Sequence, residues 1–231
     1  MKTIGIPKSD YSTKKRWEPY LKWIFPCSIN IIDVDPGFGL VKNLPDVDLL
    51  LFDGGEDVHP VLYSGTFHKT IHTNIGRDWN EKLIFEHYIK TPTLFAGICR
   101  GSQFLNIMCG GNLWADLPSE NKEHHYYHQA VILPGTTLAE QLDVKPRKSE
   151  EIDITVNSTH HQAVKDLGHN LQTVLVEPET NVIEGFESLD GKIKAVQSHP
   201  EYGDNPYKMR EEIANWLFRI ETNHEEEQRN A

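Results

Sequence analysis

The chain has 231 residues, with 34 Asp and Glu against 23 Lys and Arg, so its formal net charge is -11. This acidic balance, with no basic run longer than Lys14-Lys15-Arg16, argues against binding to nucleic acid, because such binding depends on neutralising phosphates. The three cysteines are irregularly spaced, which is typical of a reducing compartment rather than a disulfide framework. No stretch reaches the roughly 18 apolar residues of a membrane helix, so we expect a cytoplasmic protein with no membrane partner.

The first half alternates short apolar runs with amphipathic segments, which is typical of a mostly parallel sheet with helices between its strands. We expect strands at 2–6, 30–34, 47–52 and 93–96, and helices at 15–25, 77–90 and 101–108. The apolar face of the second helix is predicted to contain Trp79, Leu83, Ile84 and Tyr88, with His87 as a further candidate.

The second half contains closely spaced segments with strand character, which indicates hairpins and an antiparallel extension of the sheet. These segments are 129–133, 152–156, 171–177, 182–186 and 193–197. Asp190-Gly191 lies between the last two and is a strong signal for a tight turn. A final helix is expected at 206–220, within one domain spanning 1–222, followed by a polar tail at 223–231.

Cys99 is the candidate nucleophile. It occupies the middle of Gly97-Ile98-Cys99-Arg100-Gly101, between a predicted strand and a predicted helix. In such a turn the central residue is strained, and small residues two positions before and after let the strand and helix approach each other. The start of the helix also favours a thiolate. The alternative is an inert buried cysteine, which is our interpretation of Cys27 and Cys109.

A cysteine nucleophile needs a base that later protonates the leaving group, and a third group that orients this base. His199-Pro200-Glu201 follows a predicted strand and supplies both a histidine and a carboxylate within one tripeptide. Taken alone, this tripeptide would be read as a surface turn. Its value as a candidate pair comes from its combination with Cys99.

Acyl transfer also needs hydrogen-bond donors for the developing oxyanion. Asp53-Gly54-Gly55 ends another predicted strand, and its glycines can present backbone N–H groups to a substrate. The N–H of Arg100, directly after the nucleophile, is the second expected donor. An ordinary turn is the alternative for the glycine pair.

With these three motifs in this order, the sequence resembles the class I glutamine amidotransferase-like superfamily. Within it, Arg77-Asp78, the segment 157–162 (Asn-Ser-Thr-His-His-Gln) and the lack of a synthetase domain are similar to the γ-glutamyl-γ-aminobutyrate hydrolase group, the C26 peptidases. The resemblance extends from Ile4 to about Ile220. Where that family usually has a proline before its oxyanion glycines, this chain has Asp53.

The resemblance implies a flavodoxin-like three-layer α/β sandwich with a Cys99-His199-Glu201 triad. It implies an oxyanion hole formed by the N–H groups of Gly55 and Arg100, and no cofactor. The substrate-binding residues that it implies are Gly54, Gln103, Asn157, Ser158, His160 and His161.

The predicted function is therefore hydrolysis of a small-molecule γ-glutamyl amide through a glutamyl thioester. One alternative is a glutaminase subunit that passes ammonia to a separate synthetase, and another is a non-catalytic regulatory member of the fold. The amine half of the substrate is left open, and a homodimer is compatible with the sequence. The histidine-rich loop 124–128 lacks metal-ligand spacing, so we expect a polar loop there and no metal site. The alternative is contact with the substrate, because the loop comes shortly after the predicted nucleophile helix and would cover the pocket.

Overall fold

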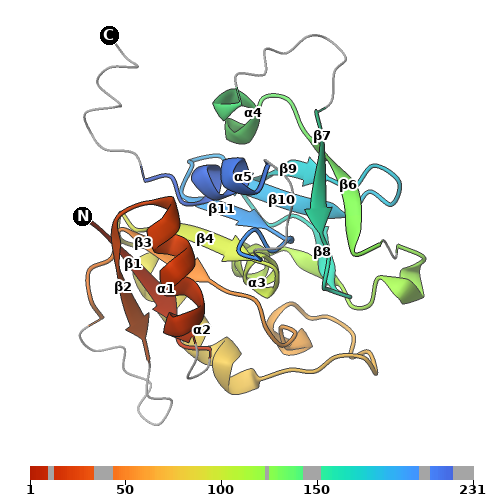
Figure 1. Ribbon diagram of the computed structural model, residues 1–231. Coiled ribbons are helices and arrows are strands. Elements are labelled where there is room, and N and C mark those ends of the chain that lie inside the picture. Colours follow the sequence, from red (N-terminus) through yellow and green to blue (C-terminus); the bar gives the residue numbers. More distant parts are fainter. Residues whose placement is uncertain (10–12, 34–43, 123–124, 143–151, 203–208, 221–231) are drawn as a thin grey trace.

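The computed structural model describes residues 1–9, 13–33, 44–122, 125–142, 152–202 and 209–220 (Figure 1). The predicted tail at 223–231 and the first residues of the predicted last helix, 206–208, lie outside the described residues. None of the described helices has both the length and the hydropathy that crossing a membrane requires.

The strands of the first half form the parallel part of one sheet. They pair in the order β2-β1-β3-β4, and β11 from the end of the chain joins β4, also in parallel. Their bounds are β1 Lys2–Pro7, β2 Cys27–Ile32, β3 Leu49–Phe52, β4 Leu94–Ile98 and β11 Ile193–Val196. Because neighbouring parallel strands end at the same edge, the residues after β3, β4 and β11 come together there.

The second half extends the sheet with antiparallel strands, as predicted. Beyond β11 the order is β10-β9-β6-β7, and a short pair, β5 and β8, attaches to β10. The bounds are β5 Asn112–Trp114, β6 Tyr127–Ile132, β7 Ile152–Asn157, β8 Ala163–Asp166, β9 Leu171–Val176 and β10 Ile183–Ser188. The turn between β10 and β11 contains Asp190-Gly191, with Gly191 at φ +71°.

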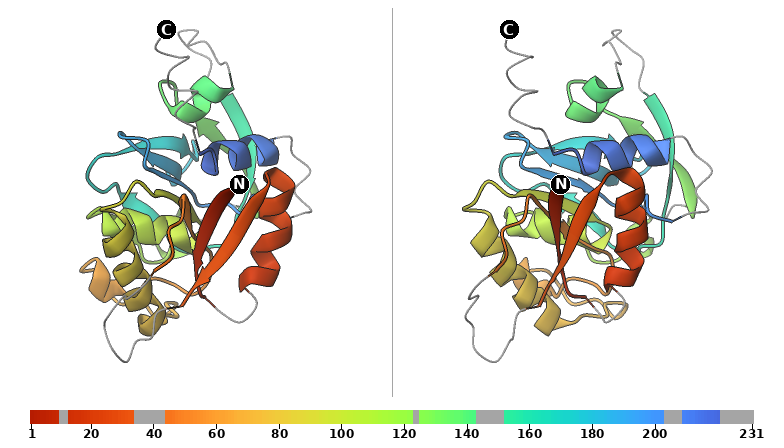
Figure 2. Two further views of the ribbon diagram at one scale, coloured as in Figure 1. Left: turned by 90° about the vertical axis from the view of Figure 1, so that its left-hand side faces the viewer. Right: turned by 60° about the vertical axis from the view of Figure 1, so that its left-hand side comes forward.

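Helices cover both faces of the sheet and make it the middle of three layers. Figure 2 shows α1 and α5 on one side of the N-terminal strands, with α2 and α3 on the other. The bounds are α1 Thr13–Ile24, α2 Ile75–Tyr88, α3 Arg100–Met108, α4 Thr137–Gln141 and α5 Met209–Leu217, with 3-10 turns at Pro60–Leu62 and Pro118–Glu120. This arrangement confirms the predicted α/β sandwich.

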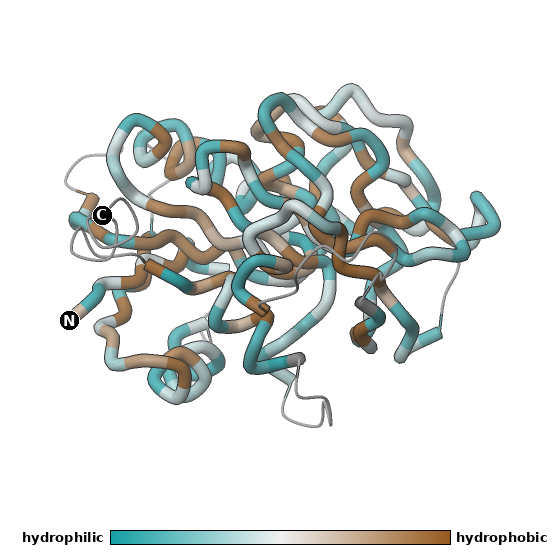
Figure 3. The backbone as a smooth tube through the Cα atoms, turned by 90° about the horizontal axis from the view of Figure 1, so that it is seen from above, coloured by the Kyte–Doolittle hydropathy of each residue, from teal (hydrophilic) through white to brown (hydrophobic). Residues whose placement is uncertain are grey.

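Alternation along the strands divides the apolar side chains between two cores. In β3, Leu49 and Leu51 face α1 and α5, whereas Leu50 and Phe52 face α2 and α3. Both faces of the strand are therefore apolar, as expected for a central parallel strand. The chain path coloured by hydropathy shows mostly hydrophobic segments through the middle and hydrophilic ones at the periphery (Figure 3).

The predicted apolar face of α2 is partly wrong. Trp79 is 47% exposed, and the ammonium group of Lys82 lies 5.0 Å from its ring centre. The buried face contains Ile84 and Tyr88 as predicted, but its first two turns carry charged residues instead. The buried residues follow helical spacing from Arg77 and Asp78 to Tyr88, and Trp79 lies outside this stripe.

The remaining differences concern short elements and strand ends. The strand expected at 30–34 begins at Cys27, and Val34 lies outside the described residues. The expectation did not include β5, β8 or α4. These have three to five residues each, which is too short for a periodic pattern to be recognised.

Candidate active site

Cys99 lies in a strained turn between β4 and α3. Its backbone has φ 53° and ψ -113°, a conformation that a residue with a Cβ rarely adopts. The residue is 7% exposed and stands at the N-cap of α3, where the first N–H groups of the helix have no partner within it.

The glycines on either side of Cys99 are required by close packing. A Cβ on Gly97 would lie 2.8 Å from Leu105 and 2.9 Å from the carbonyl oxygen of Gly101. A Cβ on Gly101 would lie only 2.0 Å from the carbonyl oxygen of Phe52 in β3. Strand and helix thus approach as closely as the sequence pattern predicts, and the approach fixes the strained turn.

His199 follows β11 and lies beside Cys99. Its Nδ1 is 2.7 Å from Oε1 of Glu201, and its ring stacks on Tyr202 with centres 4.4 Å apart and planes at 3°. The side chain of Asn157 holds its backbone: Nδ2 donates to the His199 carbonyl at 2.9 Å, and Oδ1 accepts from the His199 N–H at 2.7 Å. The imidazole is therefore fixed in position on several sides.

The pKa of His199 is raised to about 10. Burial by itself lowers this pKa, but the hydrogen bonds and charges of Cys99 and Glu201 outweigh it. The imidazolium form is thus favoured at neutral pH, and a positive charge next to a sulfur atom stabilises a thiolate. His199 thus offers a positively charged partner to the sulfur of Cys99.

Gly54 brings the end of β3 against these two residues. A Cβ placed on it would lie 2.9 Å from Cε1 of His199 and 3.7 Å from Cβ of Cys99. Gly55 has φ +147°, and a Cβ there would lie 2.1 Å from Nη1 of Arg77. A side chain at position 54 is thus excluded by His199, and a side chain at position 55 is excluded by the buried Arg77.

Arg77 anchors the glycine loop from α2. Its guanidinium donates to the carbonyl oxygens of Asp53 and Gly54, each at 3.1 Å, and to Oδ1 of Asp53 at 2.7 Å. Asp53 is 1% exposed and also accepts from Trp17 at 3.1 Å. Burial raises the pKa of Asp53, although Arg77 opposes this. Asp53, which precedes the two glycines, thus faces the interior and binds Arg77.

A second buried arginine, Arg100, follows the nucleophile directly. It is 2% exposed, and its side chain forms ion pairs with Asp78 and Glu81 of α2. Glu81 also accepts from Nε of Arg77 at 2.7 Å. Burial would raise the pKa of Glu81, but Arg100 and Arg77 together outweigh it, so this pKa is lowered. Burial raises the pKa of Asp78. The sequence analysis noted Arg77-Asp78 but missed Glu81, since an i,i+4 charge pattern usually marks a solvent-exposed helix face.

Three of the predicted substrate-binding residues have side chains engaged within the protein. Gln103 is 3% exposed, and its Nε2 donates to the carbonyl of Gln162 at 2.9 Å and to Oε1 of Gln197 at 3.1 Å. Asn157, fully buried, holds His199. Nδ1 of His160 lies 2.9 Å from the carbonyl oxygen of Gln162. Contact of these residues with a substrate stays a prediction.

Ser158 and His161 are the other two predicted substrate-binding residues of the segment 157–162. Ser158 is 9% exposed, and its N–H donates to the carbonyl of Tyr126 at 2.6 Å. His161 bridges two carboxylates, with Nε2 3.1 Å from Asp57 and Nδ1 3.2 Å from Asp116. Asp57 raises the pKa of His161 by its hydrogen bond, and Ser119 leads the contacts that lower the pKa of Asp116 to about 2. This bridge ties together the loops that follow β3, β5 and β7.

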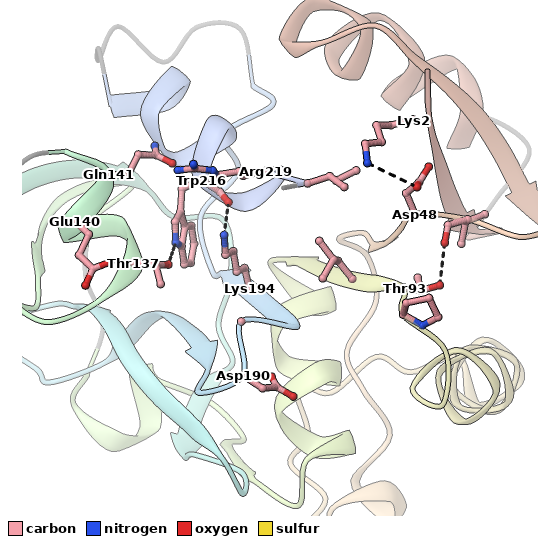
Figure 4. A pocket seen from close by; sticks show the side chains of 15 residues that line it. Lys2, Asp48, Thr93, Thr137, Glu140, Gln141, Asp190, Lys194, Trp216 and Arg219 are labelled. Atoms are coloured by element: carbon pink, nitrogen blue, oxygen red, sulfur yellow. Dashed lines mark hydrogen bonds and ion pairs between the residues drawn. The ribbon is translucent and has the colours of Figure 1, made fainter. Parts of the chain in front are cut away.

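A sizeable hollow lies away from Cys99. It has a volume of about 490 Å³, lies at the amino ends of β1, β3, β4 and β11, and is bordered by Lys2, Lys194 and Trp216 (Figure 4). A smaller hollow of about 420 Å³, between α1 and Arg210, borders Glu201. In the part of the chain that the structure describes, no three His, Cys, Asp or Glu side chains are grouped as metal ligands.

Comparisons with known proteins show which chains this one is similar to. A family model described as Peptidase C26 matches residues 33–201. Protein NtpR of Enterococcus hirae is 34% identical over 172 residues, which cover 68% of each chain. A Schizosaccharomyces pombe protein named a putative glutamine amidotransferase is 32% identical over 198 residues, covering 80% of this chain and 74% of that one.

The fold also matches solved structures. The crystal structure of a glutamine amidotransferase from Thermotoga maritima has a TM-score of 0.59 at 18% identity, with 87% of this chain and 77% of that chain covered. This likeness concerns the fold alone, and it confirms the flavodoxin-like architecture predicted from the sequence.

Proposed function

The chain belongs to the peptidase C26 family, whose model matches residues 33–201 of its 231, and from this premise we propose that it hydrolyses γ-glutamyl amides. Membership of this glutamine amidotransferase-like family implies a hydrolase-type function. The observation that carries the finer proposal is the strained Cys99, which lies against a His199 held at 2.7 Å by Glu201. A buried structural cysteine would need neither the strain nor the histidine pair.

In the proposed first half-reaction, the Cys99 thiolate attacks the γ-carbonyl carbon and forms a C–S bond, while the carbonyl electrons move to the oxygen. The N–H groups of Gly55 and Arg100 are the proposed donors to this oxyanion. When the oxyanion collapses, the C–N bond breaks, and the His199 imidazolium gives its proton to the departing amine. A glutamyl thioester and a neutral imidazole remain.

In the second half-reaction, the neutral His199 takes a proton from a water molecule as the oxygen attacks the thioester carbon. Collapse of the second oxyanion breaks the C–S bond, releases glutamate and restores the thiolate–imidazolium pair. Glu201 orients the imidazole and stabilises its charged form throughout. No cofactor is needed for these steps.

The second candidate function is glutamine hydrolysis that supplies ammonia to a separate synthetase. It is favoured by the name of the Schizosaccharomyces pombe relative, a putative glutamine amidotransferase. The two functions share the same chemistry at Cys99 and differ in the amine that leaves. Under the main proposal the substrate is a small molecule and no synthetase partner is required.

A substrate panel tests the proposal. The purified protein is incubated with glutamine and with a series of γ-glutamyl amines, and ammonia and glutamate are measured separately. Release of glutamate from γ-glutamyl amines, with little ammonia from glutamine, is the expected result. Preference for glutamine supports the second candidate, and no turnover of either class rejects both. Any activity must disappear in Cys99→Ala.

A further inference from the structure

Glu81 contacts the side chains of two arginines that adjoin the backbone groups required as oxyanion donors by the proposed reaction. Its Oε1 accepts from Nε of Arg77 at 2.7 Å, and its Oε2 pairs with Nη1 of Arg100. Arg77 contacts the glycine loop, and Arg100 is the residue directly after the nucleophile. A single buried carboxylate thus connects both sides of the proposed oxyanion hole.

Arg77 controls the orientation of the Gly54–Gly55 peptide. Its Nη1 donates to the carbonyl oxygen of Gly54 at 3.1 Å. In a planar trans peptide the C=O and the following N–H point in opposite directions, so this bond turns the N–H of Gly55 away from the guanidinium. The guanidinium also occupies the space that a Cβ on residue 55 would take. The direction of one proposed donor therefore depends on where Arg77 is held.

Arg100 carries the second proposed donor at the first position of α3. Its side chain reaches back to α2, where it meets Glu81 and Asp78. Arg77 and Glu81 have side chains 4% and 2% exposed, and that of Arg100 is 2% exposed. In such surroundings a misplaced charge is costly, so each arginine is confined to the position where its partner holds it.

The cluster consists of three buried carboxylates and two buried arginines, with one further charge of each sign at its edge. Asp53, Asp78 and Glu81 face Arg77 and Arg100, while Arg16 lies 3.6 Å from Asp53 and Glu56 lies 3.8 Å from Arg77. Among the carboxylates, Glu81 contacts both buried arginines, whereas Asp78 pairs with Arg100 and Asp53 with Arg77. The bridging role therefore belongs to Glu81.

We propose that Glu81 is a positioning residue for the hydrolytic reaction: by holding Arg77 and Arg100 together, it sets the spacing of the Gly55 and Arg100 N–H groups around the oxyanion. This inference rests on the proposed function. It assigns Glu81 no contact with the substrate. Its effect should appear in the transition state, where the oxyanion exists, and little in substrate binding.

The test compares two reactions of Cys99. Acylation by p-nitrophenyl acetate passes through an oxyanion, whereas alkylation by iodoacetamide does not. Glu81→Gln keeps the size of the side chain, and we expect it to slow acylation by about 10- to 100-fold. This is less than the roughly 10²- to 10³-fold loss of rate that follows complete removal of one oxyanion donor, because both donors remain present but misplaced. Alkylation should stay within about twofold of the wild-type rate, since the thiolate and His199 are untouched.

Two variants on the same helix serve as controls. Asp78→Asn disturbs Arg100 but leaves the bridge to Arg77, so its acylation should slow less than that of Glu81→Gln. Glu86→Gln changes an exposed carboxylate paired with Lys82 at 3.8 Å, and should leave both rates unchanged. If Glu81→Gln does not fold, the shorter Glu81→Asp replaces it, because it keeps the charge but cannot reach both arginines.

The proposal is overturned if Glu81→Gln leaves acylation unchanged, or if acylation and alkylation fall together, which would indicate general damage. It is also overturned if the wild-type protein is acylated no faster than Cys99→Ala. If wild-type Cys99 is acylated but no γ-glutamyl amide is turned over, the proposed function fails while the role of Glu81 is still decided. With a substrate in hand, Glu81→Gln should lower kcat and leave KM nearly unchanged.

Discussion

At the carboxyl ends of β3, β4 and β11 the backbone is strained at Cys99, and buried ion pairs such as Arg77–Asp53 lie beneath it. At the amino ends of the same strands a pocket of about 490 Å³ is bordered by partly exposed pairs such as Lys2–Asp48, with atoms 3.9 Å apart. This hollow is therefore at the end that lacks the strained cysteine. The hollow and the candidate site therefore lie at opposite edges of the sheet.

The difference has a physical basis. Strain and buried charge lower stability unless the surrounding structure compensates for them, so they persist where positioning is needed. A hollow between a helix end and strand starts needs no such compensation. Substitutions at the carboxyl ends of the strands should therefore lower the free energy of unfolding more than substitutions at the amino ends. Matched residues at the two ends allow this difference to be measured.

A pair of glycines gives the largest expected contrast. Gly101→Ala would place a Cβ 2.0 Å from the carbonyl oxygen of Phe52, so the nucleophile turn must shift, and we expect a loss of more than about 3 kcal/mol in the free energy of unfolding. Gly191→Ala, in the hairpin turn at the other end, meets no atom within 4 Å and has φ +71°. Its cost should be about 1 kcal/mol, from the left-handed conformation alone. Urea unfolding of both variants measures the difference, and equal costs would contradict it.

Asn157→Ala should have the next largest effect. It removes two buried hydrogen bonds to the backbone of His199, so we expect a loss of about 2–3 kcal/mol in stability and a fall of about 10- to 100-fold in turnover as the imidazole loses its position. Thr155→Val on the same strand removes a more exposed bond to Gln129 and should change stability by less than about 0.5 kcal/mol. A stable Asn157→Ala with full activity would show that His199 is held by its other contacts.

The grouping of the candidate site residues at one edge of the sheet could be predicted from the sequence, because its determinants are local. Gly97 and Gly101 flank the cysteine at fixed spacing, and His199-Pro200-Glu201 directly follows a strand. Parallel pairing then brings these segments to one edge. The antiparallel half was predictable for a similar reason, since Asp190-Gly191 marks its hairpin.

The supports of the site were not predictable in this way. Glu81 and Arg77 form an i,i+4 pair that is typical of a solvent-exposed helix, and only the packing of α2 against the glycine loop buries them. Asn157 ends a strand at the far edge of the sheet, four strand positions from β11, so its contact with His199 depends on how that edge curves back. The motif around Asn157 indicated substrate binding and gave no sign of this structural role.

The stability of the carboxyl-end site should depend on pH through His199. The pKa of His199 is raised to about 10 from an ordinary value of 6.5, so the stabilisation it brings is complete below pH 6.5 and is lost as the pH rises toward 10. Glu201→Gln removes one of the two partners that raise this pKa. Wild-type protein should exceed the variant in stability by on the order of 1 kcal/mol at about pH 6, and the difference should shrink toward about pH 10. Unfolding in urea at several pH values measures it, and a difference that grows with pH would refute the assignment.

The smallest effect is expected from Lys194→Met, at the amino end of the strand that leads to His199. Lys194 donates to the carbonyl of Trp216 at 3.1 Å, and its ammonium lies 5.6 Å from the centre of that ring, on the border of the pocket at the amino ends of the strands (Figure 4). Methionine keeps the length and the apolar contact, so stability should change by less than about 1 kcal/mol. Turnover should stay at the wild-type level, because β11 itself is unchanged and its carboxyl end is fixed by Asn157 and the nucleophile turn. A marked loss of turnover would show that the pocket communicates with Cys99 along β11, and the two ends could no longer be treated as separate.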